Sequence, residues 1–165
     1  MDHLYAPWRH TYFKEKREGC VFCHISQTPG EDRELGVLYR DEHCFVVMNR
    51  YPYNPGHFMV IPHFHTDKLE CLDPGVWQHI SLQAQNGVKL LKAVFDVPAV
   101  NLGMNIGADA GAGIAEHLHY HVVPRWYRDT NFITTVGETR VFSTDFDEVY
   151  KKLLARSGEF FGGRG

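Results

Sequence analysis

Three histidines alternate with apolar residues in the last third of the chain: His117, His119 and His121, separated by Leu118 and Tyr120. A period of two is that of a β-strand, so the three imidazoles are predicted to lie on one face. Each imidazole can attack an electrophile, or donate or accept a proton, near neutral pH. The spacing therefore predicts a catalytic strand. The main rival interpretation is that the three side chains bind one metal ion.

A loop of small residues, Gly107 to Gly113, lies shortly before these histidines and contains three glycines and three alanines. Without bulky side chains, backbone N–H groups can approach an anion closely. Such loops also occur as plain turns, but beside the histidines this one indicates a phosphate held near a nucleophile. A neutral imidazole can attack phosphorus and form a phosphoramidate, which a second nucleophile then cleaves. N–H donors stabilise the charge on the phosphoryl oxygens, and this scheme needs no catalytic metal.

Hydrophobic periodicity predicts the elements that must position these groups. Apolar residues at spacings of three and four predict a long amphipathic helix over residues 74–95. A second helix is predicted around Phe146 to Leu154, behind a Ser143–Thr144 cap. Apolar runs between turn signals predict strands at 36–40, 44–49, 57–62, 100–106 and 117–123.

Runs of strands interrupted by one long helix are typical of an α+β domain built on an antiparallel sheet. We therefore expect a single domain over residues 1–165, with an antiparallel sheet, one long helix and a C-terminal helix. Residues 1–19 are expected to form an aromatic arm, and residues 158–165 a flexible glycine-rich tail. The arm and the C-terminal helix either pack across a homodimer interface or cover the core of their own chain.

The composition argues against several classes of protein. A net charge of −3, with no block of lysine or arginine, gives no support for nucleic-acid binding. No apolar stretch approaches the roughly 18 residues of a membrane helix, and the first residues do not resemble a signal peptide. Four cysteines are too few for a disulfide scaffold, so the default is a cytoplasmic protein with reduced thiols. We interpret Cys44 and Cys71 as small buried hydrophobic residues.

The pattern His-x-His-x-His, followed by two apolar residues, resembles the signature of the histidine triad (HIT) family of nucleotidyl hydrolases and transferases. Residues 49–57 resemble the dinucleoside polyphosphate hydrolase branch of that family. Residues 4–9 and 123–132 look closest to bacterial and archaeal diadenosine tetraphosphate hydrolases and phosphorylases. The resemblance covers roughly residues 20–133. It implies a HIT-like fold, a homodimer, and cleavage of dinucleoside polyphosphates at the α-phosphate.

The resemblance also implies roles for individual residues. His119 would be the nucleophile, His121 would assist the leaving group, His117 would orient the site, and His57 would support it from behind. The residues expected to bind substrate are Asn49 at the ribose, Asn105 at the phosphates, Gly111, Ala112 and Gly113 through backbone N–H groups, and Trp126 by stacking on a base. Many family members carry Gln or Ser where this chain has Ala112 and Gly113, so at this position only backbone N–H groups are available to the leaving group.

Cys20 and Cys23 form a Cys-x₂-Cys pair, which by itself supplies half of a zinc site. His65 and His117 occupy the positions that complete a Cys₂His₂ site in zinc-binding microbial members of the family. A structural zinc held by these four residues is therefore expected. The alternative is a pair of reduced thiols with His65 on the surface. His24 is less suited, because adjacent residues seldom bind one metal.

Several functions remain open at this point. If water resolves the nucleotidyl-His119 intermediate, the enzyme is a hydrolase, and if phosphate does, it is a phosphorylase. A phosphoramidate or aminoacyl-adenylate hydrolase is the second enzymatic reading, although that branch usually has an acidic residue where this chain has Asn49. A sugar-nucleotide uridylyltransferase is disfavoured, because that group has glutamine at the position of His121. A metal-binding or nucleotide-sensing module without turnover is the non-enzymatic alternative.

Overall fold

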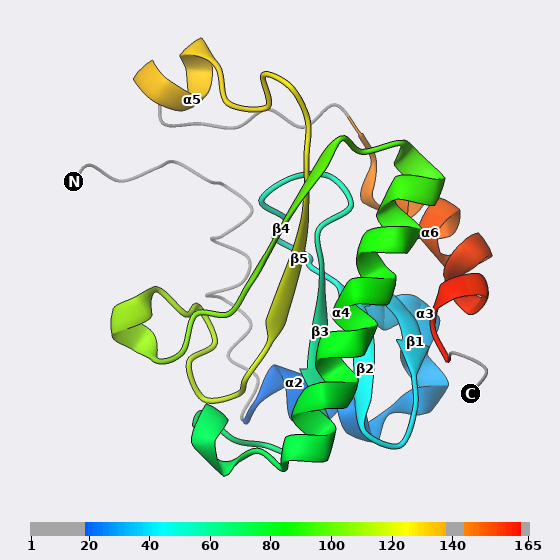
Figure 1. The fold of residues 1–165 in the computed structure, drawn as a ribbon, viewed down its shortest axis with the longest axis vertical. Helices are drawn as coiled ribbons and strands as arrows, with labels where there is room; N and C mark the ends of the chain where they lie inside the picture. The colour runs from blue at the N-terminus through cyan, green and yellow to red at the C-terminus, as the bar shows by residue number, and fades with distance from the viewer. Residues whose placement is uncertain (1–18, 138–143, 163–165) are drawn as a thin grey trace.

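The computed structural model describes residues 19–137 and 144–162. Its centre is a five-stranded sheet in which every neighbouring pair of strands runs antiparallel, in the order β1-β2-β3-β5-β4. The long helix α4 crosses one face of this sheet, and α6 packs against α4 and β1 (Figure 1). The predicted α+β architecture is confirmed. The strands are β1 (Val37–Arg40), β2 (Cys44–Met48), β3 (Phe58–Pro62), β4 (Ala99–Gly103) and β5 (Tyr120–Arg125).

Short helices and turns connect these strands. The helices are α2 (Val21–Gln27), α3 (Asp32–Leu35), α4 (Pro74–Phe95), α5 (Phe132–Val136) and α6 (Phe146–Phe160), and the 3-10 turns are η1 (Pro29–Glu31), η2 (Leu69–Cys71) and η3 (Ala108–Ala110). Within the described ranges no helix is both long and apolar enough to cross a membrane. The hydrophobic periodicity predicts α4 and α6 but gives no sign of α2, which matters for the site.

Helix α4 has the predicted bounds because both of its ends carry strong signals. The Asp73 carboxylate accepts hydrogen bonds from the N–H groups of Gly75 and Val76, and Pro74 stands in the first turn. Asp96 ends the helix in the left-handed conformation, at φ 50°. Between these ends one face of the helix is buried on β3 and β5.

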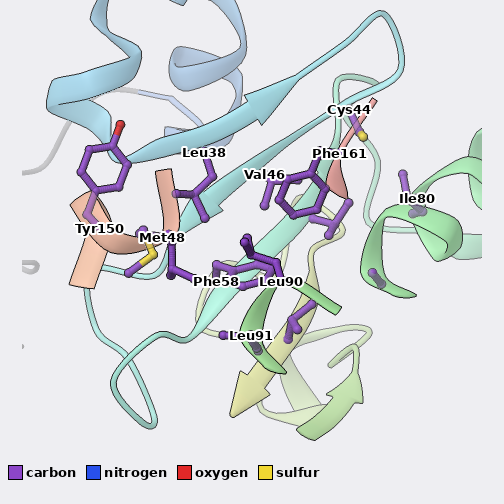
Figure 2. Close-up of a cluster of buried hydrophobic side chains, with 14 of the residues drawn as sticks. Leu38, Cys44, Val46, Met48, Phe58, Ile80, Leu90, Leu91, Tyr150 and Phe161 are labelled. Carbon is purple, nitrogen blue, oxygen red and sulfur yellow. The ribbon is translucent and has the colours of Figure 1, made fainter. Parts of the chain in front are cut away.

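The core lies on both faces of the sheet, and β2 is buried on both sides along its whole length. Cys44, Val46 and Met48 belong to the cluster between the sheet and the helices α4 and α6, part of which Figure 2 shows. Phe45 and Val47 belong to the second cluster, which covers the opposite face. A strand that is buried on both sides has a continuous run of apolar residues in its sequence, with no polar residues between them. β2 has such a run. The second cluster matters below because one of its members, Phe22, contacts His119.

The histidine-bearing strand begins later than predicted. β5 starts at Tyr120, so of the three histidines only His121 lies within it, paired with Met59 and Gly103. Before that point the chain leaves the ladder, and the N–H of Leu118 donates to the carbonyl of Thr66 at 2.8 Å. The predicted strand at 117–123 is therefore shifted to 120–125. At the edge of the sheet, β4 also ends earlier than predicted, at Gly103.

Three further predictions change near the C-terminus and at a cysteine. Asp145, one residue past the predicted Ser143–Thr144 cap, caps α6 by accepting from the N–H groups of residues 147 and 148. The predicted tail at 158–165 begins too early, because α6 continues to Phe160 and Phe161 is 4% exposed in the core. Cys71 is exposed, so its interpretation as a buried residue was wrong. The N-terminal arm at 1–18, Ser143 and residues 163–165 lie outside the described residues.

Candidate active site and metal centre

His57 and His121 form a hydrogen-bonded pair whose protonation can be worked out from its neighbours. The backbone N–H of Tyr53 donates to His57 Nδ1 at 3.0 Å, so the hydrogen of a neutral His57 sits on Nε2. That Nε2–H donates to His121 Nδ1 at 2.9 Å. The hydrogen of a neutral His121 therefore sits on its own Nε2. This nitrogen is buried and has no hydrogen-bond partner among the described residues.

His119 is held in the complementary state. Its Nδ1–H donates to the backbone carbonyl of His117 at 2.8 Å, which leaves the lone pair of a neutral imidazole on Nε2. Nε2 makes no hydrogen bond within the described part of the chain. The ring packs against His121, with ring centroids 4.8 Å apart. These two adjacent rings thus carry an unprotonated Nε2 on His119 and a protonated Nε2 on His121. These are the states that a nucleophile and a leaving-group donor need.

Burial keeps these imidazoles neutral. The pKa of His57, which has no exposed surface, is lowered to about 3 by burial and then by the neighbouring His121 and His119. Burial, followed by the charge of His119, lowers the pKa of His121 to about 4. Burial also lowers the pKa of His119, although the hydrogen bond to the His117 carbonyl opposes this. At neutral pH the His119 lone pair is therefore available for attack.

His117 faces away from this pair. Its Nε2–H donates to the carbonyl of Pro62 at 2.9 Å, which leaves the lone pair on Nδ1. Nδ1 lies 3.4 Å from Cys20 Sγ and 3.2 Å from His65 Nδ1. The side chain of His117 thus belongs to the cysteine cluster, while its carbonyl orients His119.

The four expected metal ligands, Cys20, Cys23, His65 and His117, are brought together, with all ligand atoms within 4.8 Å of one another. Cys23 Sγ lies 3.1 Å from His65 Nδ1. Around a tetrahedral zinc with Zn–N of 2.0–2.1 Å and Zn–S of 2.3 Å, neighbouring ligands stand about 3.4–3.8 Å apart. Burial and the adjacent Cys20 raise the pKa of the Cys23 thiol to about 11, an unfavourable effect that a divalent cation would reverse. The residues therefore fit zinc.

A cavity of about 560 Å³ lies next to the histidines, although His119 is not one of its lining residues. Phe22 forms part of its wall and also contacts His119, with ring centroids 5.2 Å apart. A mostly apolar pocket of this size with a few polar groups is typical of small-ligand sites. The lining residues are Gly19, Val21, Phe22, Ile25, Leu35, Val47, Met48, Asn49, Arg50, Tyr51, Met59, Gly113, Ile114, Ala115 and Glu116.

The glycine-rich loop presents its N–H groups differently from the prediction. Those of Gly111 and Ala112 already donate to the carbonyls of Ala108 and Gly107, at 2.9 and 3.4 Å. They are therefore not free to bind phosphate, and that prediction is wrong for these two residues. The N–H groups of residues 113–116 make no such bond within the described part of the chain, and these residues line the cavity. This segment offers the better donors.

The other three residues predicted to bind substrate, Asn49, Asn105 and Trp126, differ in how close they lie to the cavity and the histidines. Asn49 lines the cavity, and its amide is oriented by the N–H of Tyr51, which donates to Oδ1 at 2.9 Å. Asn105 is half-buried, two residues beyond Gly103, the partner of His121 in the sheet. Trp126 stands five residues past His121, about 16 Å along an extended chain, and packs on the core. The structure therefore does not bring Trp126 to the histidines of its own chain.

A buried polar network fixes the turn that precedes His57. Asn54 is 3% exposed, and its Nδ2 donates to the carbonyl of Pro124 and to Asp129 Oδ2, at 2.8 and 2.7 Å. Arg125 pairs with the same carboxylate at 2.6 Å, and this hydrogen bond holds the pKa of Asp129 well below its usual range. The turn is thereby fastened to the end of β5, which also carries His121. The network therefore fixes the position of His57 relative to His121.

Two residues of the site were not found from sequence. Tyr53 donates its backbone N–H to His57, and its ring lies 4.7 Å from that of His57 and 5.5 Å from that of His121. No sequence pattern marks a tyrosine in such a turn. Phe22 stands between Cys20 and Cys23, so its closeness to His119 could have been inferred once those cysteines were placed next to the triad.

Comparison with known proteins agrees with this geometry. The family profile described as HIT domain matches residues 32–127. A protein of Mycobacterium tuberculosis named AP-4-A phosphorylase is 37% identical over 151 residues, which cover 86% of this chain and 76% of that protein. The Schizosaccharomyces pombe bis(5'-nucleosyl)-tetraphosphatase [asymmetrical] is 32% identical over 89 residues, covering 54% of this chain and 48% of that enzyme.

Among solved structures, a Zn-bound histidine triad family protein from Mycobacterium smegmatis superposes with a TM-score of 0.69. It is 26% identical, and the match covers 86% of this chain and 94% of that one. The profile and the M. tuberculosis relative both extend over most of the chain. The chain therefore belongs to the HIT family.

Proposed function

We propose that the protein cleaves dinucleoside polyphosphates at the α-phosphate through a nucleotidyl-His119 intermediate. One observation carries this proposal: His119 has an unprotonated Nε2 and its ring packs against that of His121, whose Nε2 is protonated. The His119 ring also contacts Phe22, which lines a cavity of about 560 Å³. The named activities of two relatives, a phosphorylase and a tetraphosphatase of such nucleotides, support it. The apolar cavity would take the nucleoside, with Asn49 near the ribose.

The chemistry would run in two displacements. In the first, His119 Nε2 forms a bond to the α-phosphorus while the bond from phosphorus to the bridging oxygen breaks, releasing a nucleoside polyphosphate. His121 Nε2–H would donate a hydrogen bond to the leaving oxygen, and the N–H groups of residues 113–116 would face the phosphoryl oxygens. In the second, an acceptor oxygen attacks phosphorus, the phosphorus–nitrogen bond breaks, and His119 returns to its neutral state.

The acceptor that we propose is inorganic phosphate, because a relative that is 37% identical and covers 86% of the chain is named a phosphorylase. Diadenosine tetraphosphate and phosphate would then give ADP and ATP. Water as acceptor would give AMP and ATP, and the similarity to a tetraphosphatase, over about half of the chain, keeps this alternative in the test.

We also propose a structural zinc at Cys20, Cys23, His65 and His117, where it would fasten α2 to the back of the triad. Bound there, it supplies structural stability and no reaction step. A reducing compartment such as the cytoplasm would keep these thiols available. A homodimer is proposed as well: β4 is an edge strand with Leu102 45% exposed, and an edge can pair with a second copy. Sedimentation of the purified protein tests the dimer.

Product analysis tests the main proposal. Zinc-loaded protein is incubated with diadenosine tetraphosphate, with and without inorganic phosphate, and the nucleotides are separated by chromatography. We expect ADP and ATP in equal amounts with phosphate, and loss of at least a thousandfold in rate for His119→Ala. If AMP and ATP form both with and without phosphate, the acceptor is water and not phosphate. Binding of AMP without any turnover would favour the sensing module instead.

A further inference from the structure

The short helix α2 (Val21–Gln27) carries two different functions on its two sides. Cys20, at its N-cap, and Cys23 stand three residues apart and point to His65 and His117. Phe22 and Ile25, also three residues apart, are 3% and 6% exposed and line the cavity. Residues three apart share one face of a helix. One face of α2 therefore belongs to the metal ligands and another to the pocket wall.

By itself α2 has little to stabilise it. It is seven residues long, and Cys20 provides no side-chain cap for its first N–H groups. Isolated helices shorter than about 12 residues are marginal in water, so tertiary contacts must hold this one. Arg40 holds its C-terminal end by hydrogen bonds to the carbonyls of Ile25 and Ser26. The first turn, in contrast, depends on the apolar packing of Phe22 and on the four-ligand cluster. Loss of the cluster would leave that turn with the packing alone.

Contacts also run from α2 to the reacting groups. The Phe22 ring meets the His117 ring edge-on at a centroid distance of 5.6 Å, and the His119 ring at 5.2 Å. His117 is itself a ligand of the cluster, and its carbonyl fixes the Nδ1–H of His119. A metal bound by both cysteines and His117 would thus fix the pocket wall relative to the nucleophile.

We propose that Cys20 and Cys23 are positioning residues for the nucleoside pocket, so that zinc and nucleotide bind cooperatively. This inference rests on the proposed function, because it concerns the regulation of the same site. In the metal-free protein the wall formed by α2 is in its binding position for only part of the time. The apparent affinity for nucleotide falls by that fraction. Zinc restores the wall without contacting the nucleotide.

Binding of AMP, measured by calorimetry, tests the proposal without depending on turnover. We expect AMP to bind the zinc-loaded protein about tenfold more tightly than the metal-free protein. Linkage requires the same factor in reverse: saturating AMP must raise the chelator concentration that removes half of the zinc by about tenfold. This chelator titration starts from zinc-loaded protein. It therefore tests the proposal even if the metal-free protein loses its helical circular dichroism.

Single substitutions test the metal-ligand face and the pocket face of α2 independently. Cys23→Ala should bind AMP like the metal-free protein, with or without added zinc, whereas Cys71→Ala, at an exposed cysteine outside the cluster, should keep the tenfold factor. Phe22→Ala keeps all four ligands, and its zinc affinity should no longer respond to AMP. Equal AMP affinity with and without zinc, or no zinc binding at all, would overturn the inference. Cooperative binding without cleavage of diadenosine tetraphosphate would refute only the proposed function.

Discussion

Acidification is predicted to destabilise the protein through the buried pair His57 and His121. Their pKa values in the folded protein are lowered to about 3 and about 4, mainly by burial, whereas an unfolded chain has a histidine pKa near 6.5. Below pH 6.5 the two imidazoles therefore bind protons in the unfolded state but stay unprotonated in the folded state. Stability falls as the pH drops from about 6.5 towards 4, and is fully present above that range.

The magnitude follows from the same values. Each pKa unit corresponds to about 1.4 kcal/mol, so at pH 5, which is 1.5 units below the unfolded pKa, each histidine costs about 2 kcal/mol. The two together cost about 4 kcal/mol, a large part of the roughly 5–15 kcal/mol by which a domain is stable. For a chain of this size, this corresponds to a fall in Tm of roughly 10 °C.

Urea unfolding at pH 7.5 and pH 5 measures the effect, with His57→Gln as the informative variant and His43→Gln as its control. The wild type should lose about 2 kcal/mol more than His57→Gln over this interval, because one of the two buried imidazoles is gone. His43 lies outside the pair with a side chain 41% exposed, so its variant should follow the wild type. Loss of zinc in acid contributes to all three proteins and cancels in the comparison. Equal losses in wild type and His57→Gln would refute the reasoning.

Two further predictions concern packing and the metal. Gly87→Ala would place a Cβ 2.8 Å from ring carbons of the buried Phe58 and should lower stability by about 1–3 kcal/mol in thermal unfolding, whereas Gly158→Ala, in a helix with open space, should be neutral or slightly stabilising. Equal effects of the two changes would contradict this packing argument. Cys20→Ala should lower the zinc content and the Tm, both measured on the purified variant, while the exposed Cys71→Ala should change neither. Unchanged zinc content in Cys20→Ala would remove Cys20 from the ligand set.

The sequence was most informative where local signals and burial agree. The bounds of α4 follow from its apolar stripe and from Pro74, and Asp73 and Asp96 confirm them in the structure. The predicted start of β5 is too early, because alternation alone does not reveal a hydrogen bond such as that from Leu118 to the distant Thr66 carbonyl. Alternation predicts which side chains share a face, but the partner of each backbone group is set by the tertiary structure.

For the site, residue types predicted the chemistry better than they predicted the positions. His57, His119 and His121 lie together, and the four expected metal ligands, which include the third histidine of the triad, form a second group. Within the loop, turn hydrogen bonds already use the N–H groups of Gly111 and Ala112, so we propose residues 113–116 as the phosphate donors instead. Helix α2 could not be predicted, since seven residues give too short a period to recognise, and it forms where the cysteines and Phe22 are held by distant parts of the chain.

The measurement that tests the central claim most directly is peptide mass spectrometry of the enzyme after a brief reaction with diadenosine tetraphosphate, quenched in base because phosphoramidates are labile in acid. With phosphate as the acceptor, its omission should let the adenylyl group accumulate on His119, and its addition should remove the group while ADP appears. His119→Ala should carry no adenylyl group in either condition. Products formed at the wild-type rate by His119→Ala, or an adenylyl group found on His117 or His121 instead, would contradict the account.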